Sequence, residues 1–208
     1  KTNIEGTVNI LNAMRTYNVN ELIFSSSATV YGNSNFFPFI ENRIGKSTNP
    51  YGYTKIKAER KILDFCNKKN STLKAVILRY FNPIGGNVKY GLGDFPKKNE
   101  DTLMNKLTQC VNSKNKIFKI YGNKYPTKDG TCVRDFIHVK DIAIGHLASI
   151  KLLKRKKTYK IINLGSGNGY TVLEVVKTFE KILKKKITYR IVNNRKGDAA
   201  ISFANINR

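Results

Sequence analysis

Residues 72–81 read TLKAVILRYF, and this stretch decides the expected fold. Between Leu73 and Phe81 only Lys74 and Arg79 are charged. Near-continuous apolar runs of this kind are typical of strands that are buried on both faces of a parallel sheet. Residues 21–27, ELIFSSS, are a second and shorter run of this type, and it ends in small polar residues.

Two helices are expected next to these strands. Residues 3–17 place apolar side chains at helical spacing, and so do residues 50–66. The second helix has Asn49 as a suitable N-cap and Pro50 at its first position, where no backbone N–H is needed. Helix, strand, helix and strand in this order predict an α/β fold, the second half of a doubly wound, Rossmann-like parallel sheet.

Residues 83–208 have a different character. A polar, glycine-containing stretch at 87–101 is long enough to indicate a functional loop. The segments that follow are a helix at 102–112, strands at 117–121 and 136–139, a helix at 141–153, a strand at 159–164, a helix at 171–185 and a strand at 187–192. We therefore expect residues 1–82 to belong to the Rossmann-like domain, and residues 83–208 to form mainly a smaller α/β lobe with short segments that return to the first domain.

Composition narrows the class of protein. The chain has 208 residues, of which 40% are hydrophobic, so it is expected to be globular. It contains no apolar run of about 18 residues, so no membrane span is expected. Three widely spaced cysteines predict neither a disulfide framework nor a metal site, and favour a cytoplasmic location. The opening KTNIEGT and the end at Arg208 suggest a piece of a longer protein.

The formal net charge of +24 raises the question of nucleic-acid binding. Most of the 38 basic residues are lysines scattered along the chain, and no nucleic-acid recognition motif accompanies them. Lysines of this kind normally lie on solvated surfaces. We therefore expect no specific nucleic-acid partner.

A glycine-rich stretch, NLGSGNGYTVLEVV at 163–176, lies between an expected strand and an expected helix. Its spacing is Gly165-x-Gly167-x-Gly169, not the GxGxxG of a dinucleotide-binding loop, and no acidic residue follows about 20 positions later. The structural interpretation, a tight turn with Thr171 as N-cap, is therefore preferred. A dinucleotide-binding loop would then lie upstream of this sequence.

The residues that suggest chemistry are Ser27, Tyr51 and Lys55. Ser27 ends an expected parallel strand, where ligands bind in open α/β sheets. Tyr51 and Lys55 are four residues apart and so share one face of their helix. The serine hydroxyl can hold a substrate oxygen, the tyrosine phenol can move its proton, and the lysine ammonium stabilises the phenolate. Tyr-x-x-x-Lys is common by chance, so the serine is needed to give the pair a meaning.

At this point the sequence resembles a known family, the UDP-glucose 4-epimerases, which are extended short-chain dehydrogenases/reductases. The resemblance covers nearly the whole chain and is carried by six motifs in the family's order, of which YPTKDGTCVRDFIHV is the most particular: SSSATVYG (25–32), PYGYTK (50–55), LRYFNPIGG (78–86), YGNKYPTKDGTCVRDFIHVKDIAIGH (121–146), INLGSGNGYTVLEVV (162–176) and RKGDAA (195–200). It implies an NAD-dependent inversion at C4 of a UDP-hexose through a 4-keto sugar, as in galactose metabolism.

The resemblance also implies roles for individual residues. Tyr51 would be the base, Lys55 would hold the nicotinamide ribose, Ser27 would contact the O4 oxygen, and Phe81 would lie against the nicotinamide. The substrate contacts implied are Asn82 on the diphosphate or sugar, Leu103 and Tyr121 on the uridine, Arg134 and Arg195 on the diphosphate, Asp198 on the uridine ribose, and Ser202 on the sugar. Each could also be merely structural: Asn82 as a turn cap, Arg134-Asp135 as a surface ion pair, Leu103 and Tyr121 as core.

The sequence departs from the family at several positions. Thr2 and Thr102 stand where asparagine is usual, and Phe136 stands where tyrosine is frequent. Ser202 occupies a position at which a bulky tyrosine would narrow the sugar pocket. A small residue there predicts that UDP-GlcNAc and UDP-GalNAc also fit. The family pairs its subunits through the two helices at 3–17 and 50–66, so a homodimer is expected.

Three alternatives remain. A nucleotide-sugar 4,6-dehydratase would need Asp-Glu after Ser27, where this chain has Ala28 and Thr29. A 4-epimerase that acts on a uronic acid or pentose nucleotide would share the same residues. A non-catalytic protein with an NAD-binding fold would not need the Ser/Tyr/Lys set.

Overall fold

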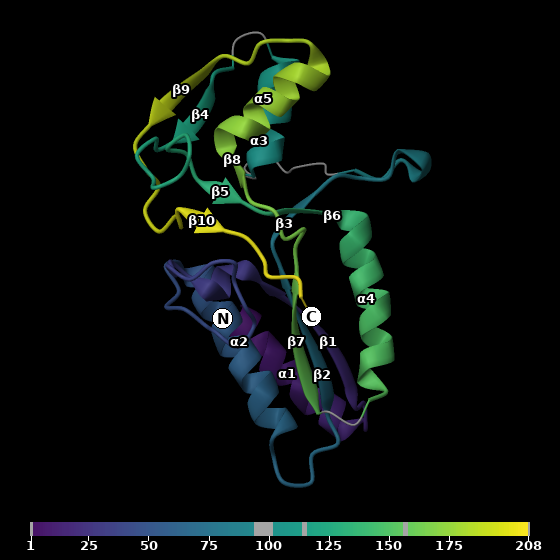
Figure 1. Cartoon of the computed structure of the whole chain (residues 1–208). Coiled ribbons are helices and arrows are strands. Elements are labelled where there is room, and N and C mark those ends of the chain that lie inside the picture. Colours follow the sequence, from purple (N-terminus) through teal and green to yellow (C-terminus); the bar gives the residue numbers. More distant parts are fainter. Residues whose placement is uncertain (1, 94–101, 114–115, 156–157, 208) are drawn as a thin grey trace.

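A computed structural model describes residues 2–93, 102–113, 116–155 and 158–207 (Figure 1). Its helices are α1 (Thr2–Thr16), η1 (Ala28–Tyr31), α2 (Pro50–Cys66), η2 (Val88–Tyr90), α3 (Leu103–Asn112), α4 (Val139–Leu153) and α5 (Val172–Leu183). Its strands are β1 (Glu21–Ser27), β2 (Lys74–Tyr80), β3 (Asn82–Ile84), β4 (Phe118–Tyr121), β5 (Val133–Arg134), β6 (Phe136–His138), β7 (Tyr159–Leu164), β8 (Tyr170–Thr171), β9 (Tyr189–Val192) and β10 (Ile201–Ser202).

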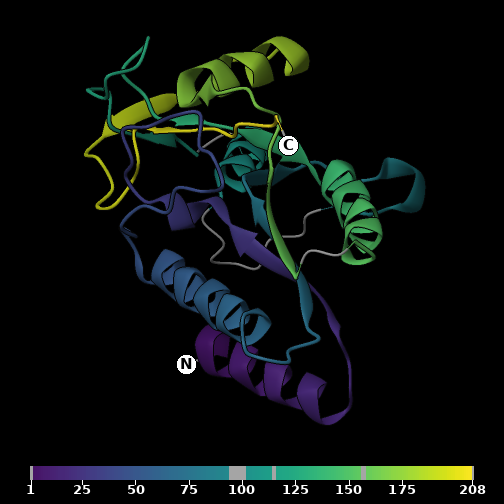
Figure 2. The ribbon, with the colours of Figure 1, turned by 60° about the horizontal axis from the view of Figure 1, so that its bottom comes forward.

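The first layer of the molecule is a parallel sheet with strand order β1-β2-β7. Helices α1 and α2 lie on one side of it and α4 on the other, as the two views in Figures 1 and 2 show. The three carboxyl ends of these strands point toward the second lobe (Figure 1).

Strand β2 explains why both faces of this sheet are covered. Ala75 and Ile77 pack into the cluster formed with α1 and α2, whereas Val76 and Leu78 pack against α4. All four are at most 1% exposed. Successive side chains of a strand point to opposite faces, so an unbroken apolar run requires a helical layer on each side.

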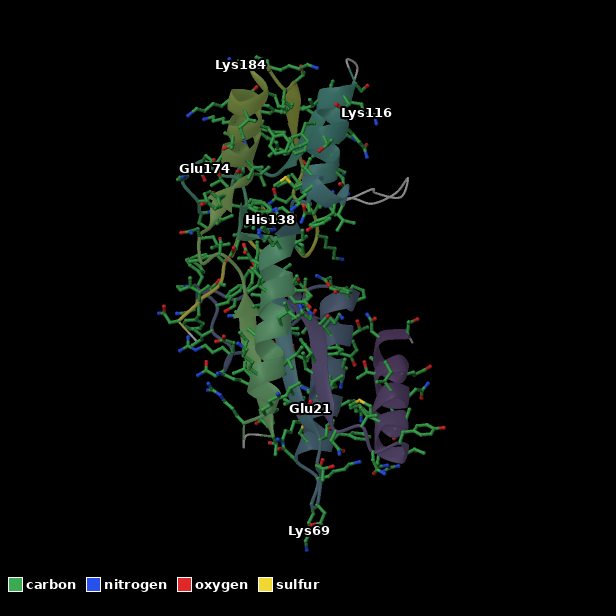
Figure 3. All side chains as sticks on the ribbon, turned by 90° about the vertical axis from the view of Figure 1, so that its right-hand side faces the viewer. Glu21, Lys69, Lys116, His138, Glu174 and Lys184 are labelled. Carbon is green, nitrogen blue, oxygen red and sulfur yellow. The ribbon has the colours of Figure 1, made fainter. Side chains whose placement is uncertain are left out.

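The second lobe is built around the parallel pair β4-β9 and the helices α3 and α5, whose core includes Leu107, Phe118 and Val176. The small sheets β10-β5-β8 and β3-β6 lie between this lobe and the first sheet (Figure 1). Figure 3 shows the length of the molecule, with Lys184 and Lys116 at one end, Lys69 at the other and His138 between them.

The expected α/β fold with parallel sheets is confirmed, and most element bounds agree within two or three residues. The short strands β3, β5, β8 and β10 were not predicted, because two or three residues carry no periodicity. The division at residue 82 stays a prediction. Of the expected functional loop at 87–101, residues 94–101 lie outside the described part. No helix in the described ranges is long and apolar enough to cross a membrane.

Candidate active site

The Ser27 side chain lies at the carboxyl end of β1, where it caps the short helix η1. Its Oγ accepts hydrogen bonds from the backbone N–H of Thr29 (3.3 Å) and from Thr29 Oγ1 (3.0 Å). The hydroxyl hydrogen of Ser27 is therefore available to a further acceptor, since both of these contacts use the oxygen as acceptor. Ser27 lies at the sheet edge that binds ligands in open α/β folds.

Helix α2 brings Tyr51 and Lys55 to the same edge. Asn49 Oδ1 accepts from Gly52 N (2.8 Å), so the predicted N-cap is confirmed. The Lys55 Nζ donates to the carbonyl oxygen of Ser25 in β1 (2.8 Å) and lies 5.7 Å from the Tyr51 ring centroid. Tyr51 and Lys55 thus lie together in the first two turns of α2, and Lys55 contacts the strand that ends at Ser27.

Burial distinguishes the Lys55 ammonium from an ordinary surface lysine. Desolvation lowers the pKa of Lys55 below its usual value, and the carboxylate of Glu59 partly opposes this shift. The Lys55 Nζ also lies 4.9 Å from the Phe24 ring centroid. A cation held against a strand carbonyl and an aromatic ring is in a fixed position, as required for a group that acts on the neighbouring phenol.

The same helix carries a second pair with identical spacing, Tyr53 and Lys57. The Lys57 Nζ lies 5.5 Å from the Tyr53 ring centroid, and Tyr53 is 52% exposed against 50% for Tyr51. Of these two lysines, only Lys55 has a described hydrogen bond to β1. The contact with the sheet, and not the spacing, identifies the candidate base.

A cavity of about 1580 Å³ opens beside the second lobe. Six of the predicted substrate contacts line it: Asn82, Leu103, Tyr121, Arg134, Arg195 and Asp198. Ser27, Tyr51, Lys55, Phe81 and Ser202 are not among the lining residues. The predicted nucleotide contacts thus share one cavity that does not include the predicted catalytic set. The two parts of the site are linked by Thr48, just before α2, whose Oγ1 donates to the backbone oxygen of Gly197 beside Asp198 (2.7 Å).

Two arginines line the cavity, and each makes a defined contact. Arg134 forms an ion pair with Asp198 (3.5 Å) and donates to the backbone oxygen of Ala199 (2.7 Å). The Arg195 guanidinium lies 4.0 Å from the Tyr121 ring centroid, and its hydrogen bond lowers the pKa of Tyr121. Planar cations next to an aromatic ring form a surface suited to a base and its phosphates.

Phe81 and Asn82 occupy different environments. Phe81 is 4% exposed and packs near the rings of Tyr31 and Phe39, so in this chain it is a core residue. Asn82 is half-buried, and its Nδ2 donates to the backbone oxygen of Asp135 (2.7 Å). This contact ties Asn82, the first residue of β3, to the residue before β6. Its role in binding a ligand stays a prediction.

The environment of Asp135 excludes one alternative interpretation, namely that Arg134 and Asp135 form an ion pair on the surface. Asp135 is 0% exposed, and Arg134 pairs with Asp198 instead. The Asp135 carboxylate accepts from the backbone N–H groups of Ser166 (2.7 Å), Gly167 (3.1 Å) and Ala204 (3.0 Å). The glycine loop thus binds a carboxylate of its own chain, which supports its structural interpretation.

Ser202 and two of the departures from the family are the remaining positions to place. Ser202 lies in β10, half-buried and paired in register with Arg134. Thr102 and Phe136, two of the departures from the family, line the cavity. Sequence reasoning missed Asn105, which also lines the cavity. Asn105 is 6% exposed, and its side-chain Nδ2 has no hydrogen-bond partner within the described ranges. The sequence offered one signal for this residue, a polar asparagine at a helix position that faces the core.

Comparison with known proteins gives consistent matches. The pattern of the NAD dependent epimerase/dehydratase family matches residues 1–165. The UDP-glucose 4-epimerase of Bos taurus is 43% identical over 206 residues, which are 99% of this chain and 59% of that protein. The crystal structure of UDP-glucose 4-epimerase from Bifidobacterium longum in complex with NAD+ and UDP is 40% identical with a TM-score of 0.92, over 99% of this chain and 61% of that one.

A third match is the UDP-Glc/GlcNAc 4-epimerase from Campylobacter jejuni, which is 34% identical with a TM-score of 0.78 over 99% of this chain and 61% of that one. The chain thus spans about 60% of the length of the proteins it matches. Because the family pattern covers most of its residues, the chain belongs to the NAD dependent epimerase/dehydratase family.

Proposed function

We propose that this chain is part of an isomerase that interconverts UDP-glucose and UDP-galactose by NAD-dependent epimerisation at C4. The observations that carry the proposal are the cavity that gathers Arg134, Arg195 and Asp198, and the contact of Lys55 with the strand that ends at Ser27. The relatives named above support the substrate class. The β1-β2-β7 sheet would be the second half of a doubly wound, Rossmann-like sheet, and residues 83–208 mainly the nucleotide-sugar lobe.

The described residues fit one end of an NAD molecule. The Ser27 hydroxyl, the Tyr51 phenol and the Lys55 ammonium are hydrogen-bond donors at the carboxyl edge of a parallel sheet, which suits a nicotinamide ribose. The backbone N–H groups of Ser166 and Gly167 donate to Asp135, so this loop would not hold the pyrophosphate. When bound, NAD supplies reversible hydride chemistry at the sugar carbon.

The residues of this chain would move and hold the proton. The Tyr51 phenol oxygen takes the proton from the O4 hydroxyl of the sugar, and later returns it after the sugar has turned. The Ser27 hydroxyl donates to the same oxygen and fixes its place. The Lys55 ammonium stabilises the negative charge on the phenol oxygen while it lacks its proton. General acid–base help of this kind is worth on the order of 10² to 10⁴-fold in rate.

The cavity residues would bind the nucleotide part of the substrate. Arg134 and Arg195 carry planar guanidinium groups that suit diphosphate oxygens. Tyr121 and Leu103 would flank the uracil, and Asp198 would accept from the ribose hydroxyls. Asn82 lines the cavity and would contact the diphosphate or the sugar.

Individual residues bear on the alternative reactions and substrates. The 4,6-dehydratase alternative is disfavoured, because Ala28 and Thr29 carry no group that could shuttle the protons of water elimination. UDP-GlcNAc and UDP-GalNAc are proposed as additional substrates, since Ser202 is small. A uronic acid or pentose nucleotide stays an alternative substrate, and a non-catalytic protein with this fold stays an alternative function. A cytoplasmic location is proposed.

The test is conversion in D2O by the full-length gene product supplied with NAD. UDP-galactose should yield UDP-glucose, and the C4 hydrogen should be protium by NMR, because the hydride removed from C4 is returned to it. A product lighter by one water would indicate the dehydratase. Deuterium at C4, or no conversion of either hexose, would overturn the proposal.

A further inference from the structure

We infer that Glu59 and Arg79 are positioning residues for the reaction, through a buried ion pair that fixes the first two turns of α2 against the sheet; this inference rests on the proposed function. Both side chains are 0% exposed, Glu59 on α2 and Arg79 on β2. Two parallel hydrogen bonds join them: Arg79 Nε to Glu59 Oε1 (3.0 Å) and Arg79 Nη2 to Glu59 Oε2 (2.7 Å). Neither residue was singled out by sequence analysis.

The place of Glu59 on its helix connects this pair to the candidate site. Tyr51, Lys55 and Glu59 follow one another at intervals of four residues, so they lie in successive turns near one face of α2. Lys55 donates to β1, and Glu59 binds β2. Two neighbouring strands thus hold two successive turns of the helix, and Tyr51 occupies the turn that follows toward the helix N-terminus.

The ion pair is extended into a network that crosses the whole first sheet. Ser26 of β1 donates to Glu59 Oε1 (2.5 Å), and Arg79 Nη1 donates to the Tyr31 hydroxyl (3.0 Å). That hydroxyl donates to Asn163 Oδ1 of β7 (2.5 Å). Ser26 is the neighbour of Ser27, so the same network fixes the strand end that carries the candidate serine.

A buried ion pair is a poor device for stability alone. Replacing both partners with apolar side chains is often neutral or stabilising, because the desolvation of two charges offsets their attraction. What two charges with a forked geometry do provide is a fixed angle and distance between two elements. Accurate placement matters in catalysis, since a displacement of about 1 Å can cost on the order of 10²-fold in rate.

The experiment compares three variants of the full-length protein. Glu59→Gln keeps the shape and removes the charge. Glu59→Leu with Arg79→Met removes both charges and fills the space with apolar groups. Leu11→Ala is the control, because Leu11 is a buried core residue on α1 that takes no part in the network. Each variant is measured for thermal unfolding, for kcat and KM on UDP-galactose, and for hydrogen exchange at the amides of residues 51–58 without substrate.

We expect kcat to fall at least tenfold in Glu59→Gln and in the double variant, with KM within about threefold, because the nucleotide contacts lie in the other lobe. Exchange at residues 51–58 should become faster in both. Leu11→Ala should lose thermal stability and keep kcat within about twofold. The double variant decides the question if Glu59→Gln does not fold.

The inference is overturned if the folded double variant keeps the kcat of the parent, or if exchange at residues 51–58 is unchanged in it. A parent protein without epimerase activity would refute the proposed function instead. In that case the exchange measurement alone decides whether the ion pair positions α2.

Discussion

Tyr51 and Tyr53 differ less in their own exposure than in the lysine that follows each of them by one turn. Lys55 donates to the Ser25 carbonyl oxygen, and desolvation lowers its pKa, whereas the described contact of Lys57 is with the Tyr53 ring. A phenol that gives up a proton needs a cation that stays in place while it does so. At the scale of single residues, the fixed position of the Lys55 ammonium distinguishes the candidate site from a chance Tyr-x-x-x-Lys spacing.

Ser202 supports a prediction about substrate size. In Ser202→Tyr, the full-length protein should keep turnover of UDP-galactose within a few-fold and lose turnover of UDP-GalNAc, because the ring excludes the acetamido group. Ser202→Ala is the matched control and should retain both activities. Product analysis by chromatography on the two UDP-sugar pairs gives the answer. If the parent does not turn over UDP-GalNAc, the pocket argument fails.

Single residues also show what could and could not be predicted from the sequence alone. The spacing Tyr-x-x-x-Lys occurs twice within seven residues, and only the pair Tyr51 and Lys55 was considered from the sequence. The Glu59–Arg79 pair was not predicted, although an arginine inside an apolar strand is a signal of a buried partner. The partner could not be chosen from sequence, because it depends on how α2 packs on the sheet.

At the scale of elements, the strand-to-helix loop at 165–169 shows how a glycine pattern can serve the fold. A side chain at Gly165 would come within 2.4 Å of the Asp135 carboxylate, so the loop needs a glycine to admit this group. Thr171 is the N-cap of α5, as predicted from the sequence, and it also forms a capping box with Glu174. The loop, the strand β5 and the segment at Ala204 are joined at Asp135.

This arrangement predicts the effect of Asp135→Asn on stability. The amide nitrogen of asparagine cannot accept, so backbone N–H groups of the loop or of Ala204 would lose their acceptor in a buried place. The free energy of unfolding should fall by about 3 kcal/mol in urea titrations. Asp141→Asn, on the exposed first turn of α4, should change it by less than about 0.5 kcal/mol. Equal effects of the two variants would refute this role of Asp135.

The packing of α2 on β2 makes a contribution to the free energy of unfolding that depends on pH. Burial raises the pKa of the Cys66 thiol to about 11. The unfolded thiol ionises near pH 8.5, as model thiols do. The folded pKa lies above the unfolded one, so the contribution is fully present below about pH 8.5 and is lost as the pH rises toward 11.

In Cys66→Ala the free energy of unfolding should therefore fall less as the pH rises above about 8.5. Between pH 7.5 and pH 10 the parent should lose up to about 2 kcal/mol more unfolding free energy than the variant. Urea titrations of both proteins at the two pH values measure the difference. Parallel decreases in the two proteins would contradict the assignment to Cys66.

The elements themselves were largely predictable. Long helices and the apolar strands have periodic or continuous patterns, so their positions followed from sequence within a few residues. The two- and three-residue strands β3, β5, β8 and β10 were not, because they exist only through pairing with distant segments. These short pairings place the cavity residues Asn82 and Arg134, so the shape of the cavity could not be predicted without the structure.

At the scale of the whole molecule, α1 and α2 pack side by side on the outer side of the first sheet (Figure 2). We propose a homodimer through these two helices. Ile10 is 57% exposed on α1, and an aspartate there would be buried without a partner in such an interface.

Ile10→Asp should convert the dimer to a monomer in size-exclusion chromatography with light scattering. Ile182→Asp is the control, since Ile182 is 72% exposed on α5 in the other lobe and should leave the dimer intact. A parent protein that is monomeric at micromolar concentration, or an Ile10→Asp variant that stays dimeric, would refute this interface.

The central claim is that Tyr51 moves the proton of the sugar hydroxyl. Its most direct test is kcat for UDP-galactose in Tyr51→Phe and Tyr53→Phe of the full-length protein, with circular dichroism to show that both are folded. The two tyrosines share a helix, an exposure and a following lysine. We predict that Tyr51→Phe lowers kcat on the order of 10² to 10⁴-fold and that Tyr53→Phe stays within about threefold of the parent. A Tyr51→Phe variant that turns over as fast as Tyr53→Phe would contradict the account.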